Sequence, residues 1–138
     1  MVDNWWSTES GSPITGIALG LDGRRIPIKP GSAGKPMPGW EVRAVDDDGR
    51  GENSSVMYHV HPVNTCKEVK RGEMGNIVLG MPLSPTGFRT LWQDDNKFKT
   101  GYLGRFNGAW LDTGDAGMVD EQVTILPTCL KFSNTFYK

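Results

Sequence analysis

The chain has 138 residues, the size of one ordinary domain with room for a modest hydrophobic core. Its 15 Lys and Arg nearly balance its 16 Asp and Glu, which argues against nucleic acid or an anionic membrane as a partner. Glycine (18 residues) and proline (9 residues) are abundant, so turns and short strands are favoured over long helices.

The first half of the sequence predicts strands separated by turns. Residues 13–21 predict a short strand or an extended loop, and residues 31–39 are rich in turn-forming glycine and proline. In residues 40–46 larger apolar side chains recur at every second position, the period of a half-buried strand. The Asp-Asp-Gly at 47–49 then predicts a tight turn.

The second half predicts further strands and one helix. Residues 50–67 are polar and without a pattern, whereas residues 77–81 form a short apolar run of the buried-strand type. Residues 91–102 predict the helix, with the larger apolar side chains roughly on one face. Residues 110–120 predict a strand, a sharp turn and the start of another strand, and residues 123–138 have no usable pattern. The fold class we expect is mainly β, in short antiparallel pieces, with minor α.

The run Asp-Asn-Trp-Trp-Ser-Thr-Glu-Ser-Gly at residues 3–11 places aromatic rings beside a hydroxyl and a carboxylate. Trp5 and Trp6 can stack on a planar base and wall off a pocket, or they can simply pack in the core. Thr8 can donate a hydrogen bond to a phosphate oxygen, and Glu9 can hold a Mg²⁺ ion that bridges phosphates. The alternative for this pair is an ordinary helix N-terminus.

Two other groups of residues can carry chemistry. Asp115 follows Gly114, where a carboxylate can accept hydrogen bonds from the vicinal hydroxyls of a ribose or can simply form a turn. His59, His61 and Cys66 offer three ligands for zinc, but a fourth at a recognisable spacing is missing from the sequence. A small zinc protein therefore stays open as a weaker alternative.

Taken together and in order, four segments resemble the AMP-forming acyl-CoA synthetases of the adenylate-forming ligase superfamily, in particular their short-chain acetyl/propionyl branch. The segments are residues 3–11, 30–49, 68–92 and 98–121. The resemblance implies part of the large domain of these ligases. That part is a distorted antiparallel β-barrel subdomain plus the edge of a nucleotide-binding α/β subdomain, and it is incomplete.

The resemblance also implies roles for individual residues. Glu9 would hold Mg²⁺, Trp6 would close the pocket for a two- or three-carbon acid, and Asp115 would bind the ribose hydroxyls. Acetate or propionate would attack the α-phosphate of ATP to give an acyl-adenylate and pyrophosphate, and coenzyme A would then displace AMP. The residues implied in ATP or AMP binding are Asp3, Asn4, Trp5, Trp6, Ser7, Thr8 and Asp115.

The sequence also departs from the family. Ser7 replaces a glutamine that is usual in acetate enzymes, and the phosphate loop and the lysine-bearing C-terminal lid are not found. We therefore expect residues 1–121 to be a partial ligase domain, interrupted by a foreign insert at 50–67. Residues 122–138 would be an unrelated, disordered tail. We hypothesise that both foreign segments are translated intron. Transcripts that cross the two junctions without a gap would contradict this hypothesis.

As a partial domain, the chain would lack the subdomains that are its partners in the intact ligase. The alternative function is then non-enzymatic: a catalytically inactive chain that acts at most as a weak nucleotide-binding or interaction module. We expect no pyrophosphate release by these 138 residues alone. No secretion signal is recognisable, so Cys66 and Cys129 are expected to be reduced thiols in an intracellular protein, cytoplasmic or mitochondrial.

Overall fold

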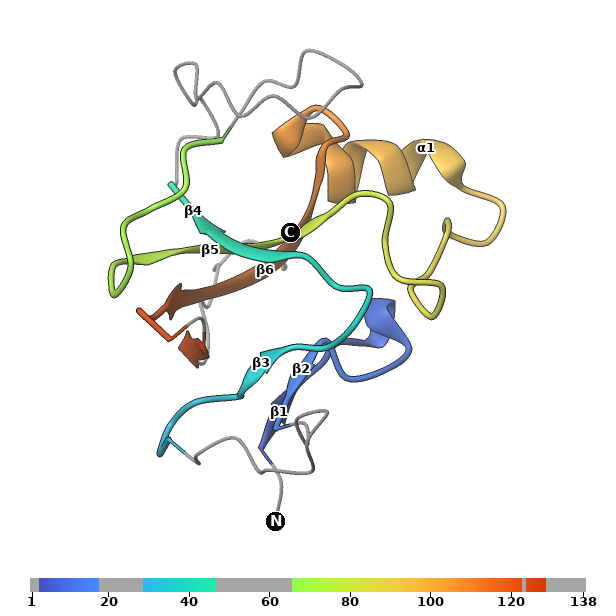
Figure 1. Cartoon of the computed structure of the whole chain (residues 1–138). Helices are drawn as coiled ribbons and strands as arrows, with labels where there is room; N and C mark the ends of the chain where they lie inside the picture. The colour runs from blue at the N-terminus through green and yellow to red at the C-terminus, as the bar shows by residue number, and fades with distance from the viewer. Residues whose placement is uncertain (1–2, 18–28, 47–65, 123, 129–138) are drawn as a thin grey trace, which may run out of the picture.

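The computed structural model describes residues 3–17, 29–46, 66–122 and 124–128. Two antiparallel sheets dominate it, so the expected mainly β fold is confirmed. Figure 1 shows the smaller sheet, β1 to β3, below the larger one. The smaller sheet consists of β1 (Asn4–Trp5), β2 (Thr15–Gly16) and β3 (Lys35–Pro36) in that order.

The larger sheet has four strands in chain order, and every neighbouring pair is antiparallel. The predicted strands at 40–46 and 77–81 are confirmed as its first two members, with shifted ends. Residues 76–80 are buried without alternation, as expected for an apolar run covered on both faces. The strands are β4 (Val42–Val45), β5 (Met74–Gly80), β6 (Trp110–Val119) and β7 (Ile125–Thr128).

Backbone hydrogen bonds link the two sheets. The Ala33 amide donates to the Ile125 carbonyl, and the Ile125 amide donates to the Gly34 carbonyl, each over 2.9 Å. Gly34 has φ +85°, and a Cβ there would lie 2.2 Å from the Gly16 carbonyl oxygen, so only glycine allows this close approach. β7 of the larger sheet is thereby held beside the end of the smaller one.

The predicted helix at 91–102 is displaced toward the C-terminus. The helical residues are α1 (Asp95–Phe98), a π-helical turn (Lys99–Leu103) and a 3₁₀ turn (Gly104–Phe106). The Asp94 carboxylate accepts the Lys97 amide over 2.9 Å and so sets the start of α1. Trp92, expected on the apolar helix face, lies before this cap and is 89% exposed. In the described part of the chain, no helix has the length and apolar character needed to cross a membrane.

The predicted strand–turn–strand at 110–120 is wrong in one respect, because β6 runs through the Thr-Gly-Asp segment as one strand. Asn76 pairs with Ala116 and Val78 pairs with Asp112, so residues 113–115 of β6 lie opposite the single residue Ile77 of β5. Gly114 adopts φ +74° within this bulge. The local turn signal is real, but it produces a bulge because the chain resumes pairing with the same partner.

Part of the expected disordered tail is ordered. Residues 125–128 form β7, which pairs with residues 116–119 of β6. Ile125 is fully buried, and its apolar side chain holds this stretch against the core. The sequence around it has no pattern, so this contact was not predicted. The rest of the expected tail, from residue 129, lies outside the described residues.

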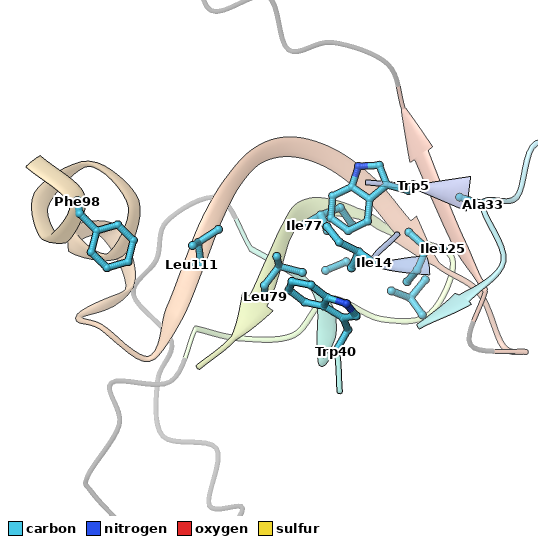
Figure 2. Packing of buried hydrophobic residues seen from close by; sticks show 11 residues of the cluster. Trp5, Ile14, Ala33, Trp40, Ile77, Leu79, Phe98, Leu111 and Ile125 are labelled. Carbon is cyan, nitrogen blue, oxygen red and sulfur yellow. The ribbon is translucent and has the colours of Figure 1, made fainter. Parts of the chain in front are cut away.

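The main hydrophobic cluster lies between the two sheets and extends toward α1. Figure 2 shows Trp5, Ile14, Trp40, Ile77 and Ile125 gathered together, with Phe98 of α1 toward Leu111 of β6. Among the described residues, no buried side-chain nitrogen or oxygen lacks a hydrogen-bond partner. The core thus joins segments from both ends of the chain.

The expected insert at 50–67 falls largely outside the described residues, but its two flanks lie side by side. The Asp46 amide donates to the Lys67 carbonyl over 3.0 Å, and Val45 forms an antiparallel bridge with Glu68. This is the geometry with which two antiparallel strands enter and leave a short hairpin loop.

Replacing residues 47–65 by Asn-Gly should therefore preserve the fold. Closing a shorter loop costs less entropy, by about 0.6 kcal/mol for each halving of its length, so replacing 19 residues by 2 should raise the free energy of unfolding by about 2 kcal/mol. Urea unfolding followed by tryptophan fluorescence measures it. Loss of a cooperative transition in the shortened chain would show that residues 47–65 are needed for folding.

Asp120 fixes the corner between β6 and β7. Its carboxylate accepts the side-chain ammonium of Lys29, the amides of Gln122 (2.9 Å) and Thr124 (2.8 Å), and the Thr124 hydroxyl (2.6 Å). Burial alone would raise the pKa of Asp120, but the hydrogen bonds from Lys29 and Thr124 outweigh it and hold that pKa well below its usual range.

Asp120→Asn should lower the free energy of unfolding by about 2 kcal/mol at neutral pH, because charge-assisted hydrogen bonds are lost. The folded-state pKa lies below the unfolded value, so the carboxylate's contribution is complete above about pH 4 and is lost as the pH falls through the folded-state pKa. Urea unfolding at several pH values should show that the difference in the free energy of unfolding between the unsubstituted chain and Asp120→Asn becomes smaller below about pH 4. A gap independent of pH would contradict this role.

Candidate functional site

The N-terminal run folds into β1 followed by a single 3₁₀ turn, Thr8–Ser10. The Ser10 hydroxyl closes the turn, since it donates to the Ser7 carbonyl over 2.7 Å and accepts the Ser7 amide over 3.1 Å. Thr8 and Glu9 therefore do open a short helical turn, as the structural alternative proposed. Their side chains are nevertheless accessible, Thr8 being exposed and Glu9 half-buried.

Glu9 is held in place by the loop before α1 and by the helical segment itself. Its carbonyl accepts the Phe88 amide over 2.8 Å, and its carboxylate accepts the Tyr102 hydroxyl over 3.3 Å. The rings of Phe88 and Tyr102 pack edge to face with their centroids 5.0 Å apart. A Cβ on Gly11 would lie 2.5 Å from the Thr86 carbonyl oxygen, so the turn and the loop are in tight contact.

Tyr102 is a residue that sequence reasoning placed only on the apolar face of a helix. Burial first, and then the neighbouring Glu9 carboxylate, raise the pKa of its phenol. The phenol therefore remains a hydrogen-bond donor at neutral pH. Because the two residues are 93 positions apart, no local signal predicts their contact.

Asp115 is presented by the bulge in β6. Its amide donates to the Thr113 hydroxyl over 3.2 Å, and that hydroxyl donates to the Ile77 carbonyl over 2.6 Å. The Asp115 carboxylate accepts the indole N–H of Trp5 over 2.9 Å, across 110 positions of sequence. The structure thus brings the N-terminal run and the Gly-Asp segment together, as expected if they form one site.

The two tryptophans have different environments. Trp5 is 8% exposed and belongs to the core cluster in Figure 2, whereas Trp6 is 61% exposed. Asp3 and Asn4 are also exposed, and Ser7 is half-buried. Trp6 thus has surface free for a ligand, while Trp5 serves both the core and the contact with Asp115.

The zinc alternative receives no support from the described residues. His59 and His61 lie outside them, and no group of three or more His, Cys, Asp or Glu side chains in the described part could hold a metal. Cys66 packs against a small cluster that includes Val45 and Phe106, and burial raises the pKa of its thiol. The thiol has the surroundings of a packing residue.

Comparison with named proteins identifies relatives of the chain. It is 38% identical over 122 residues to the Mus musculus protein named acyl-CoA synthetase short-chain family member 3, mitochondrial, which aligns with 88% of the chain. It is 36% identical over 120 residues, 87% of its length, to the propionate–CoA ligase of Escherichia coli strain K12. The acetyl-coenzyme A synthetase of Streptomyces avermitilis is 35% identical over 125 residues, again with 88% of the chain aligned. The chain is a homologue of part of the short-chain acyl-CoA synthetases.

Solved structures agree with this assignment to the acyl-CoA synthetases. MatB from Rhodopseudomonas palustris has a TM-score of 0.62 and 25% identity, over 91% of this chain and 20% of that one. The anthranilate CoA ligase AuaEII, solved in complex with anthranoyl-AMP, has a TM-score of 0.60 and 28% identity, over 91% and 18%. The expected fold, part of an adenylate-forming ligase domain, is confirmed. No protein-family model matches the chain.

The chain spans only 15% to 16% of the length of these synthetase relatives. The described part holds a carboxylate on a 3₁₀ turn, a hydroxyl beside it, an exposed tryptophan and a second carboxylate on the β6 bulge. These groups suit a nucleotide with its metal and a small apolar group.

Proposed function

We propose that the chain supplies part of the nucleotide and acyl site of an AMP-forming short-chain acyl-CoA ligase. The observation that carries this proposal is the hydrogen bond between the Trp5 indole N–H and the Asp115 carboxylate. It brings residues 3–11 and the Gly-Asp segment of β6 together in one place. Relatives named for acetyl-CoA and propionate ligation support the same class of reaction. The mouse relative's name supports a mitochondrial location, and a cytoplasmic one remains the alternative we propose.

The proposed reaction has two steps. A carboxylate oxygen of the acid forms a bond to the α-phosphorus of ATP, and the bond to the β-phosphate oxygen breaks to release pyrophosphate. The thiolate of coenzyme A then attacks the acyl carbonyl, and the bond to AMP breaks. Catalysis of the first step depends on positioning and on stabilising negative charge on the phosphates.

The chain's own residues take five roles in this proposal, of which the metal ligand is described in the next paragraph. The Thr8 hydroxyl donates to the α-phosphate, and the Asp115 carboxylate accepts the ribose hydroxyls. Asp3, Asn4 and Ser7 lie along the same run and would line the nucleotide. The exposed ring of Trp6 would close the acyl pocket and limit the acid to two or three carbons. A longer acyl chain would be excluded because the indole ring would occupy the volume that the chain needs.

Glu9 fits the requirements of a Mg²⁺ ligand. It is an oxygen donor with accessible surface, and Mg²⁺ in nucleotide sites is bound by one or two carboxylates together with phosphates and water. The described residues offer no protein-only cage, so the phosphates would have to supply ligands. When bound there, Mg²⁺ would neutralise phosphate charge. Glu9 itself would be oriented by the Tyr102 hydroxyl.

Asp115→Asn should weaken AMP binding to the chain by about tenfold or more, because hydrogen bonds to a charged acceptor are replaced by weaker ones. Isothermal titration calorimetry measures the dissociation constant for both proteins. Glu121→Gln is the matched control, since it removes the same charge from an exposed residue just beyond β6. Equal affinities of the unsubstituted chain and Asp115→Asn for AMP would contradict the proposed ribose contact.

Tyr102→Phe should reduce the gain in ATP affinity that Mg²⁺ provides by about threefold or more, because Glu9 loses a hydrogen bond that orients it. Binding of AMP without metal should not change. Titrations of ATP with and without Mg²⁺ give the two dissociation constants. Phe98→Leu is the control, because it alters the same aromatic cluster and leaves the hydroxyl in place. The same gain in Tyr102→Phe as in the unsubstituted chain would contradict the role of Tyr102.

A further inference from the structure

The surroundings of Trp5 show which part of its side chain is available to the proposed site. Its ring packs in the main cluster and only 8% of the residue is exposed, so little of the ring face is left to contact a base. In Figure 2 the indole nitrogen lies on the edge of the ring that points away from Ile14 and Trp40. That edge carries the single polar group of the side chain.

A buried indole N–H must have an acceptor, because leaving it unpaired costs the free energy of its lost hydration. Here the acceptor is Oδ2 of Asp115, at 2.9 Å. A backbone carbonyl could have satisfied the donor equally well. The structure instead directs it to the carboxylate that carries the ribose contact in the proposed site.

This hydrogen bond adds a constraint to a carboxylate whose backbone is already fixed. The amide of Asp115 is bound to Thr113, which is in turn bound to Ile77 of β5. The side chain still has rotational freedom that these bonds do not remove. The indole N–H fixes one carboxylate oxygen, and an ionised carboxylate keeps further lone pairs for two neighbouring hydroxyls.

We propose that Trp5 is a positioning residue whose indole N–H orients the Asp115 carboxylate toward the vicinal hydroxyls of a ribose. Trp5 thereby contributes to the choice of ribonucleotides over nucleotides without these hydroxyls. The inference rests on the proposed function, because it takes Asp115 as the ribose contact. It goes beyond that function in giving Trp5 an action of its own, through Asp115.

The test compares AMP with 2′,3′-dideoxy-AMP, which lacks both ribose hydroxyls. Trp5→Phe keeps an aromatic ring and removes the N–H. The ratio of the two dissociation constants should be about tenfold or more for the unsubstituted chain, and Trp5→Phe should reduce it by about fivefold or more. In an Asp115→Asn background, Trp5→Phe should not change the ratio further, because the two residues act through one bond.

Trp40→Phe is the matched control. Trp40 is also 8% exposed and belongs to the same cluster, so this variant removes the same atoms from the same core. It should change the affinities for both nucleotides by the same factor and leave their ratio unchanged. A purely structural role of Trp5 predicts this behaviour for Trp5→Phe as well.

A measurement without nucleotide tests the bond itself. In nitrogen-15 NMR spectra, Asp115→Asn should shift the Trp5 indole N–H resonance and leave that of Trp40 nearly unchanged.

The nucleotide titrations separate the inference from the proposed function. If Trp5→Phe binds AMP and keeps the same ratio of the two dissociation constants as the unsubstituted chain, the inference is overturned and the proposed function stays intact. An unsubstituted chain that binds neither nucleotide would overturn the proposed function, and the inference with it.

Discussion

The pairing of β6 along both of its edges is the constraint on which the rest of the structure depends. β5 lies on one side and β7 on the other, and together they fix residues 110–119 as one strand. Within that strand, three residues must fit opposite one residue of β5. The bulge that results is the reason Asp115 leaves the regular alternation of the strand and meets Trp5.

The core and the candidate site share residues, so the same side chains serve the packing of the fold and the geometry of the proposed site. Trp5 contributes to the main cluster through its ring and to the site through its N–H. Tyr102 similarly packs its ring against Phe88 and donates its hydroxyl to the Glu9 carboxylate. Both carboxylates of the site are therefore held by groups that the packed core already keeps in place. Such preorganisation lowers the entropy that a bound nucleotide would have to remove.

The sequence predicted the elements whose signals are local. An apolar run indicated the buried strand at 77–81, and alternation indicated the strand at 40–46. The order of four segments indicated the ligase family, and residues 3–11 and Asp115 were assigned to one site by resemblance. Their meeting in space agrees with that assignment.

The features that the sequence did not predict depend on distant partners. A Gly-Asp pair at a bulge has the same local signature as one at a turn, and only pairing with β5 separates the two. The start of α1 was misplaced because the cap at Asp94 outweighs the apolar spacing that begins at Leu91. The contact of Tyr102 with Glu9 and the strand at 125–128 each require a partner far along the chain.

The central claim is that the N-terminal run and the β6 bulge form a single nucleotide site. Titration of the nitrogen-15-labelled chain with AMP, followed by two-dimensional NMR, tests it most directly. The claim predicts that the signals of Trp6, Thr8 and Asp115 shift together and fit one dissociation constant. Shifts confined to one of the two segments, or different dissociation constants for the two, would contradict it.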